Sequence, residues 1–167
     1  MAATTGVDVV TKVYQVYIKA TPESIWDAIT KPEWTEKYGY SGRAEYTPDL
    51  SPGATFRSLA SEEFQQAGMP EVVVDGTVLE ADPPRRLVQT WRFLWNEEVR
   101  SEGPTTVTFE IADQGNGITK LTLTHVLENA PVTTAQIAGE IEGAGGGWAY
   151  VLSDIKSLLE TGHALHA

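Results

Sequence analysis

Three histidines are the residues of this sequence best suited to acid–base or metal chemistry. His125 falls in the alternating segment of residues 118–127, on the same face as Leu121 and Leu123, so its imidazole is predicted to point inward. An inward histidine is a hydrogen-bonded structural residue, a polar anchor in a binding pocket or a general base. A general base also needs an orienting acid, and Glu128 is predicted on the opposite face of the strand.

The other two histidines, His163 and His166, have the spacing of paired metal ligands on a helix, but they follow Gly162, which is predicted to end the last helix. Two ligands at a flexible end bind metal weakly, so no metal site is predicted. The absence of cysteine excludes disulfides, thiolate catalysis and Cys-based zinc or iron–sulfur sites. One inward histidine does not complete a Ser-His-acid triad, so no catalytic residue is predicted.

A glycine-rich run at residues 143–147 is the segment that most suggests a nucleotide cofactor. It lacks the Lys-Ser or Lys-Thr pair of a phosphate-binding loop, and Trp148 stands where a dinucleotide fingerprint needs its third glycine. No cofactor is therefore predicted. The missing side chains predict instead that the helix start comes close to the sheet, or that space is left for a ligand.

Aromatic residues are the strongest indication of a binding site. Trp91, Phe93 and Trp95 alternate along one predicted strand, and with Phe109 and Trp148 they form either plain core or the wall of an aromatic box. The predicted ligand-binding residues are Trp91, Phe93, Phe109, His125, Trp148 and Leu152.

Hydrophobic periodicity and turn residues predict the elements that position these side chains. Thr21 is expected to cap a helix that begins at Pro22 and ends or kinks at Pro32. A segment opened by Thr133 or Thr134 is expected to carry Ile137 and Ile141 in a helix, and the last helix runs from Trp148 to Gly162 with Leu152, Ile155 and Leu159 on its apolar stripe. Strands are predicted over residues 13–20, 42–47, 55–60, 72–81, 85–95, 105–111 and 118–127, and a second short helix over 33–38.

This order of elements predicts an α+β helix-grip fold. A curved antiparallel sheet wraps around a long C-terminal helix, and two short helices follow the first strand. The length of 167 residues fits one domain. We expect a flexible leader over residues 1–11, a single helix-grip domain over 12–162 and a flexible tail over 163–167.

Charge limits the partners. The chain has 12 basic and 23 acidic residues, so a net charge of −11 would repel nucleic acid and anionic membranes. Arg85, Arg86 and Arg92 are the densest basic group, and we interpret them as solvated strand residues. The sequence has neither a secretory signal nor an apolar run of about 18 residues, which predicts a cytoplasmic protein.

Four stretches resemble a known family: IKATPESIWDAITKPEW, DGTVLEADPPRRLVQTWRFLW, EGPTTVTFEI followed by TKLTLTH, and GGGWAYVLSDIKSLLETG. Together they are similar to the activator-of-heat-shock-protein-90-ATPase homologue-like family, in its bacterial single-domain branch, within the START and birch-pollen-allergen-like (SRPBCC) superfamily of helix-grip folds. The resemblance implies a ligand carrier, a sequestering protein, a polyketide cyclase or aromatase, or a co-chaperone domain. The separate N-terminal chaperone-binding domain of the eukaryotic activator is not expected here.

The residues and the resemblance favour one function over two alternatives. The leading hypothesis is binding or sequestration of a small hydrophobic or aromatic molecule between the sheet and the last helix, without turnover. The second is a co-chaperone-like interaction with a protein partner. The third is a cyclase-like or aromatase-like enzyme, which needs at least two titratable groups in the cavity, and the sequence brings only His125 there.

Overall fold

The computed structural model describes residues 8–39, 43–142 and 145–165. Predictions made for residues 1–7, Gly42, Gly143 and His166 concern positions outside these ranges. The strands are β1 (Val9–Ile18), β2 (Arg43–Thr47), β3 (Thr55–Leu59), β4 (Val72–Asp82), β5 (Arg86–Phe93), β6 (Thr105–Gly115) and β7 (Ile118–Glu128). The helices are α1 (Pro22–Thr30), α2 (Pro32–Thr35), α3 (Glu62–Gln66), α4 (Glu97–Ser101), α5 (Pro131–Ile137) and α6 (Gly147–Thr161).

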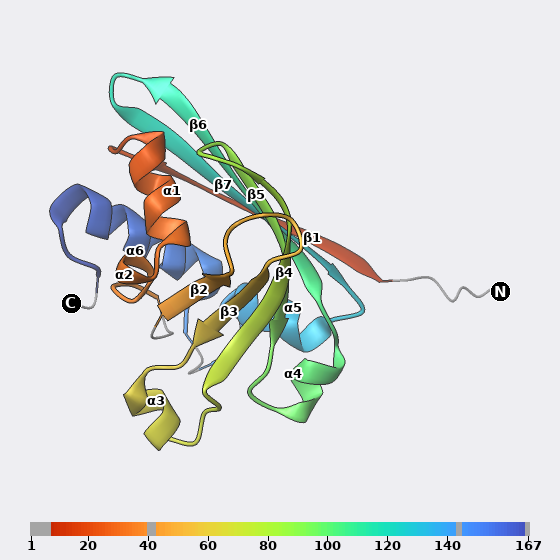
Figure 1. Ribbon diagram of the computed structural model, residues 1–167. Helices are drawn as coiled ribbons and strands as arrows, with labels where there is room; N and C mark the ends of the chain where they lie inside the picture. The colour runs from red at the N-terminus through yellow and green to blue at the C-terminus, as the bar shows by residue number, and fades with distance from the viewer. Residues whose placement is uncertain (1–7, 40–42, 143–144, 166–167) are drawn as a thin grey trace.

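The strands form one antiparallel sheet in the order β1-β7-β6-β5-β4-β3-β2. Figure 1 shows this sheet curving, with α1, α2 and α6 on the same side of it. Register shifts between β3 and β4 and between β4 and β5 accompany the bend, as expected of bulges that increase local twist. The predicted α+β helix-grip fold is confirmed.

The β6–β7 hairpin is the element that the sequence predicts most fully. Side chains alternate strictly along β7, and Leu121, Leu123 and Leu127 are fully buried on the same face as His125. The turn residues Gly115, Asn116 and Gly117 all have positive φ, as their residue types indicate. This face packs toward the helices and forms the floor of the core.

Helix α1 begins as predicted. The Thr21 hydroxyl accepts a hydrogen bond from the Ser24 N–H at 3.1 Å, and Pro22 occupies the first turn, where its missing N–H costs nothing. Lys31 is the C-cap, and Pro32 starts α2 immediately afterwards. Proline therefore separates the two helices, but α2 is shorter than the predicted segment of residues 33–38.

The last helix, α6, buries Trp148, Leu152, Ile155 and Leu158 against the sheet. It ends at Gly162, whose φ of 87° is left-handed and whose N–H bonds to the Leu158 carbonyl, as the sequence predicts.

The start of α6 approaches a different neighbour from the one expected. Gly147 has φ +67°, and a Cβ there would overlap the Ile137 carbonyl oxygen and lie 2.7 Å from the Gly139 nitrogen. The close approach is therefore to the end of α5 rather than to the sheet.

Helix α5 differs from its prediction at both ends. It begins at Pro131, its N-cap is Ala130, and neither Thr133 nor Thr134 caps it. The Glu102 carboxylate, from the α4–β6 connection, accepts bonds from the Val132 and Thr133 N–H groups and from the Thr133 hydroxyl. A residue about thirty positions away thus supplies the acceptors that a local cap would provide.

That helix stops at Ile137, so the prediction that Ile141 continues it is wrong. Two short helices, α3 and α4, were not predicted at all. The strand β1 starts at Val9, within the segment expected to be a flexible leader. In the expected tail, Ala164 is buried, and the Leu165 N–H donates to Asp154 Oδ1 at 2.6 Å.

Candidate ligand-binding cavity

A cavity of about 720 Å³ lies between the concave face of the sheet and α6. Side chains from β2 to β6 form one wall, and α6 forms the opposite wall, with further residues from α1, α3 and α5. Five of the six predicted site residues line it: Trp91, Phe93, Phe109, Trp148 and Leu152. The other lining residues are Ile29, Thr35, Tyr38, Gly39, Ala44, Tyr46, Phe56, Ser58, Phe64, Met69, Val73, Val74, Gln89, Trp95, Gln136, Ile137, Gly145, Gly147, Val151 and Ile155.

The aromatic residues of the cavity form a continuous cluster around Trp91. Its ring stacks on Phe56 with centroids 5.6 Å apart and packs directly against Trp148 of α6, with centroids 4.9 Å apart. Phe109 packs edge-on against Trp148 at 6.2 Å, which joins β6 to α6. Rings in such contacts have few accessible rotamers, so this wall presents a rigid apolar surface.

His125 does not line the cavity and is fully buried. Its Nδ1 accepts a hydrogen bond from Trp148 Nε1 at 3.0 Å, and its Nε2 lies 2.6 Å from Thr105 Oγ1. The Thr105 hydroxyl donates to the Trp91 carbonyl at 2.8 Å, so it must accept from the histidine, which assigns the proton to Nε2.

Both imidazole nitrogens are therefore occupied within the protein. Burial lowers the pKa of His125 to about 3, so the ring stays neutral at physiological pH. The residue positions Trp148 through a hydrogen bond. Of the three roles left open by the sequence, the hydrogen-bonded structural role fits this geometry.

Among the described residues that line the cavity, the titratable ones are two tyrosines. Burial, and then the nearby Asp154 carboxylate, raise the pKa of Tyr38. Burial, followed by interaction with Tyr38, raises the pKa of Tyr46. The Tyr38 hydroxyl donates to the Ala28 carbonyl at 2.7 Å, and the Tyr46 hydroxyl donates to Gln89 Oε1 at 2.6 Å. Both phenols therefore stay neutral and already use their protons.

Sequence reasoning missed Gln89, which is fully buried in the cavity wall. The signal was present, because Gln89 shares the inward face of β5 with Trp91 and Phe93 at a spacing of two residues. A polar residue on an otherwise apolar face marks either a structural hydrogen bond or a ligand contact. Tyr46 and Phe56 were missed for a different reason, since their short strands show little alternation.

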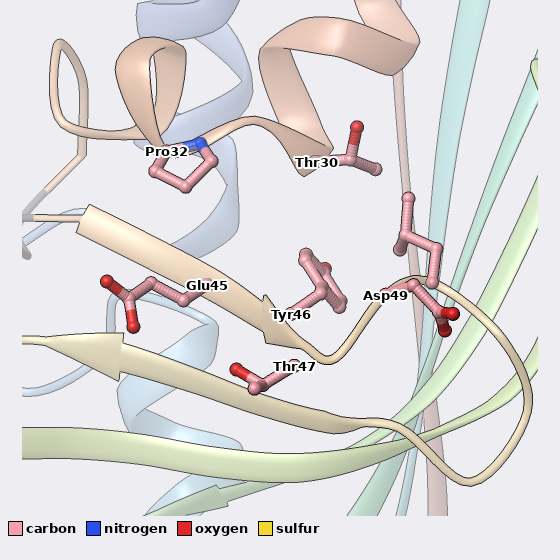
Figure 2. Close-up of a pocket in the computed structure, with 7 residues that line it drawn as sticks. Thr30, Pro32, Glu45, Tyr46, Thr47 and Asp49 are labelled. Carbon is pink, nitrogen blue, oxygen red and sulfur yellow. The ribbon is translucent and has the colours of Figure 1, made fainter.

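A second, smaller hollow of about 440 Å³ lies between the junction of α1 and α2 and the end of strand β2 (Figure 2). Thr30 and Pro32 face strand β2 across it, and Tyr46 belongs to both hollows. Its two carboxylates have partners elsewhere: Glu45 pairs with arginines, and Asp49 accepts a bond from the Ser51 N–H. Both carboxylates of this hollow thus have partners within the protein.

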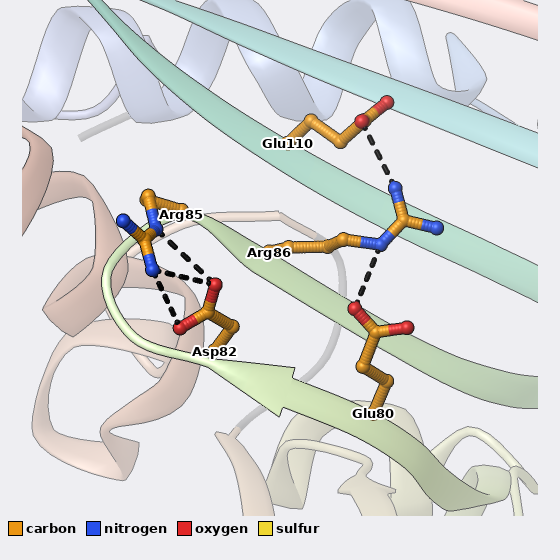
Figure 3. Close-up of polar contacts among 5 residues, drawn as sticks. All are labelled: Glu80, Asp82, Arg85, Arg86 and Glu110. Atoms are coloured by element: carbon orange, nitrogen blue, oxygen red, sulfur yellow. Dashed lines mark hydrogen bonds and ion pairs between the residues drawn. The ribbon is translucent and has the colours of Figure 1, made fainter.

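The arginines singled out from the sequence are each paired with a carboxylate. Figure 3 shows Arg85 on Asp82, at 2.9 Å, and Arg86 between Glu80 and Glu110, at 2.9 and 3.0 Å. Arg92 makes a bidentate contact with Asp75, with N···O distances of 2.8 and 3.0 Å. Each of these guanidinium groups is therefore already paired with a carboxylate of the protein.

Among the described residues, no group of three or more His, Cys, Asp or Glu side chains is placed to hold a metal ion. His163 is exposed at the end of α6. Within the same ranges, no helix combines the length and apolar character needed to cross a membrane.

A curved antiparallel sheet that closes over one long helix, with an aromatic cavity between them, defines a helix-grip protein. The sequence model of the family described as "Activator of Hsp90 ATPase homolog 1-like protein" matches residues 19–160. The chain belongs to this family, and the family resemblance seen in the sequence is confirmed. No curated protein matches the chain.

Solved structures with similar folds come from several organisms. Protein MLL2253 from Mesorhizobium loti is 20% identical, covers 90% of this chain and 96% of its own, and gives a TM-score of 0.66. Protein NE0264 from Nitrosomonas europaea is 19% identical, with 91% and 95% covered and a TM-score of 0.65. PFC0360w, an HSP90 activator from Plasmodium falciparum, is 25% identical, with 93% and 91% covered and a TM-score of 0.52.

Proposed function

We propose that this protein binds and sequesters a small hydrophobic or aromatic molecule in the cavity between the sheet and α6. The observation that carries the proposal is the cavity of about 720 Å³ with its cluster of aromatic rings. This volume lies within the range of small-molecule sites, roughly 300 to 1,000 Å³. Family membership supports the proposal, because the superfamily of helix-grip folds includes ligand carriers.

Binding without turnover is the form of this proposal that the side chains support. Catalysis of the cyclase or aromatase kind requires an acid and a base that converge on the ligand. The described lining contains Tyr38 and Tyr46 as its titratable residues, and both phenol protons are engaged in hydrogen bonds. His125 does not line the cavity, and both of its ring nitrogens are in hydrogen bonds within the protein.

A screen of apolar compounds tests the proposal. Aromatic polyketides, flavonoids and fatty acids are added, and tryptophan fluorescence and melting temperature are measured. A ligand beside Trp91 and Trp148 is expected to quench fluorescence saturably and to raise the melting temperature with the logarithm of its excess. Mass spectrometry of the recovered compound is expected to show it unchanged. A chemically altered compound would instead support an enzyme.

A second candidate function is an interaction with a protein partner, as in a co-chaperone. It draws on the similarity to the Plasmodium falciparum HSP90 activator and on exposed apolar side chains of β1. Val9, Val13 and Tyr17 share the outer face of that strand and are each about half exposed. Stimulation of an Hsp90 ATPase by this protein, abolished by Val13→Lys, would favour this candidate. Under the leading proposal, the ATPase rate is unchanged.

A further inference from the structure

Two buried nitrogen atoms, on residues that line the cavity, lack hydrogen-bond partners. Among the side chains of the described residues, Gln89 Nε2 and Trp91 Nε1 are the buried nitrogen or oxygen atoms without one. An unpaired buried N–H costs free energy, because in the unfolded chain water satisfies it. Such groups are rare in folded proteins, and each one calls for an explanation, such as a bound water, ion or other molecule.

The orientation of the Gln89 amide is fixed by Tyr46. The Tyr46 hydroxyl lies 2.6 Å from the Gln89 oxygen, a distance typical of an O–H···O bond and short for a bond from an amide nitrogen. The oxygen of the amide is thus engaged, and its NH₂ group is the end without a partner. Gln89 therefore offers hydrogen-bond donors.

Both donors belong to one strand and one face. Gln89 and Trp91 are two residues apart on β5, so their side chains point to the same side, about 6.5 Å apart along the strand. Both residues line the cavity, and the Trp91 ring is held between Phe56 and Trp148. This pair of donors, which we call the β5 donor pair, sits beside the aromatic wall.

The described lining of the cavity has no charged side chain that could balance the charge of a ligand. The described lining contains no Asp, Glu, His, Lys or Arg side chain. The buried Asp154 carboxylate lies on α6 outside this lining and accepts bonds from the Gly39 and Leu165 N–H groups. A carboxylate or ammonium group would lose its hydration in this space without an opposite charge in the wall, which is strongly unfavourable.

We infer that the ligand is an uncharged aromatic molecule with a carbonyl-type oxygen, which accepts hydrogen bonds from the β5 donor pair. This inference rests on the proposed function and adds the chemical class of the ligand. The aromatic wall binds the apolar body, and the donor pair distinguishes a ketone, quinone or lactone from a hydrocarbon of the same shape. Fatty acids are excluded as good ligands.

Three probes with one diphenyl skeleton test the inference: diphenylmethane, benzophenone and 4-benzoylbenzoate. Their dissociation constants are measured by titration calorimetry on the full chain. Benzophenone is expected to bind roughly tenfold more tightly than diphenylmethane, because only the ketone satisfies the donors. The carboxylate is expected to bind more weakly than benzophenone.

Variants assign the preference to the donor pair. Trp91→Phe keeps a ring and removes the N–H, and Gln89→Met removes the amide at similar length. Each is expected to reduce the ketone preference to less than threefold while diphenylmethane still binds. Trp95→Phe is the matched control, because it removes another indole N–H from the lining without touching the donor pair. It is expected to keep the preference.

The outcomes separate the two proposals. Equal binding of benzophenone and diphenylmethane by the unmodified protein would overturn the inference and leave the apolar cavity function standing. A ketone preference that survives both Gln89→Met and Trp91→Phe would also overturn it. Binding of none of the probes, together with a failed compound screen, would overturn the proposed function itself.

Discussion

At the scale of single residues, one hydrogen-bond chain connects the two walls of the cavity. It runs from Trp148 on α6 to His125 on β7, then to Thr105 on β6 and to the Trp91 carbonyl on β5. Every donor in the chain meets an acceptor, so the neutral imidazole is held in one tautomer. The consequence is that Trp148 is fixed both by its ring contacts and by its N–H.

The first prediction concerns the pH dependence of stability. The pKa of His125 is about 3 in the folded protein and ordinarily 6.5, so below pH 6.5 the unfolded chain takes up a proton that the folded protein does not. Stability is therefore fully present above pH 6.5 and falls as the pH drops toward 3, by about 1.5 kcal/mol between pH 6.5 and 5. Urea denaturation across this range measures it.

The variant His125→Gln supplies the control for this pH dependence. It is expected to be less stable than the unmodified protein at pH 7, because the histidine bonds are lost, yet to lose less stability between pH 6.5 and 5. An identical pH slope in both proteins would contradict the buried, neutral histidine.

The second prediction concerns the Trp148 N–H. Trp148→Phe keeps an aromatic ring but leaves His125 Nδ1 as a buried acceptor without a partner, which costs about 1 to 3 kcal/mol of unfolding free energy. Trp95→Phe removes the same ring atoms from a partly exposed position and is expected to cost less. Chemical denaturation compares the two variants, and equal losses would contradict the role of the hydrogen bond.

At the residue scale, the sequence predicted which way the His125 side chain points but not its hydrogen-bond partners. The alternation of β7 places His125 inward, and the structure agrees. Its hydrogen-bond partners Thr105 and Trp148 come from other elements, 20 and 23 positions away. Sequence spacing does not predict contacts between such distant residues. For the same reason, the orphan donors of Gln89 and Trp91 appear only in three dimensions.

At the scale of elements, prediction was best where the hydrophobic pattern stayed regular over many residues. The β6–β7 hairpin and α6 each have ten or more residues of consistent pattern, and both were predicted. The short helices α3 and α4 carry little periodicity. They do carry N-cap signals that were overlooked, since Ser61 accepts from the Phe64 N–H and Asn96 accepts from the Val99 N–H. Helix α5 has no local cap, because distant Glu102 replaces it.

The third prediction tests the contact between α5 and α6. Gly147→Ala places a methyl group against the Ile137 carbonyl in a left-handed conformation, so a loss of more than about 3 kcal/mol is expected. Gly162→Ala is the matched control at the other end of the same helix. It has φ +87° with open space around it, and only about 1 kcal/mol is expected there. Similar melting temperatures for the two variants would contradict the close approach.

The fourth prediction tests the long-range cap of α5. Glu102→Ala removes the acceptor of two backbone N–H groups and one hydroxyl, and we expect a loss of about 1 to 2 kcal/mol in unfolding free energy. Glu102→Gln keeps one acceptor oxygen and is expected to lose less. Thermal or urea denaturation of both variants measures this difference, and a neutral Glu102→Ala would show that the cap contributes nothing.

At the scale of the whole molecule, the cavity follows from the curvature of the sheet. Figure 1 shows the seven-stranded sheet bending around α6. Side chains of α6, β2 and β3 all line the cavity, so they leave the space between them unfilled. The sequence predicts the inward face of each strand, but the remaining volume depends on bulges and on how far α6 stands from the sheet. Five of the six predicted site residues line the cavity, whereas the contributors from β2, β3 and α3 were found only in the structure.

The central claim is that an apolar ligand enters the cavity beneath α6, and the five tryptophan indole N–H signals test it directly. Trp91, Trp95 and Trp148 line the cavity, whereas Trp26 and Trp34 do not. Titration with diphenylmethane, followed by ¹H–¹⁵N correlation NMR, is predicted to shift the first three signals and leave the other two in place. Signals that all remain unmoved at saturating probe, or a shift confined to Trp26 and Trp34, would contradict the claim.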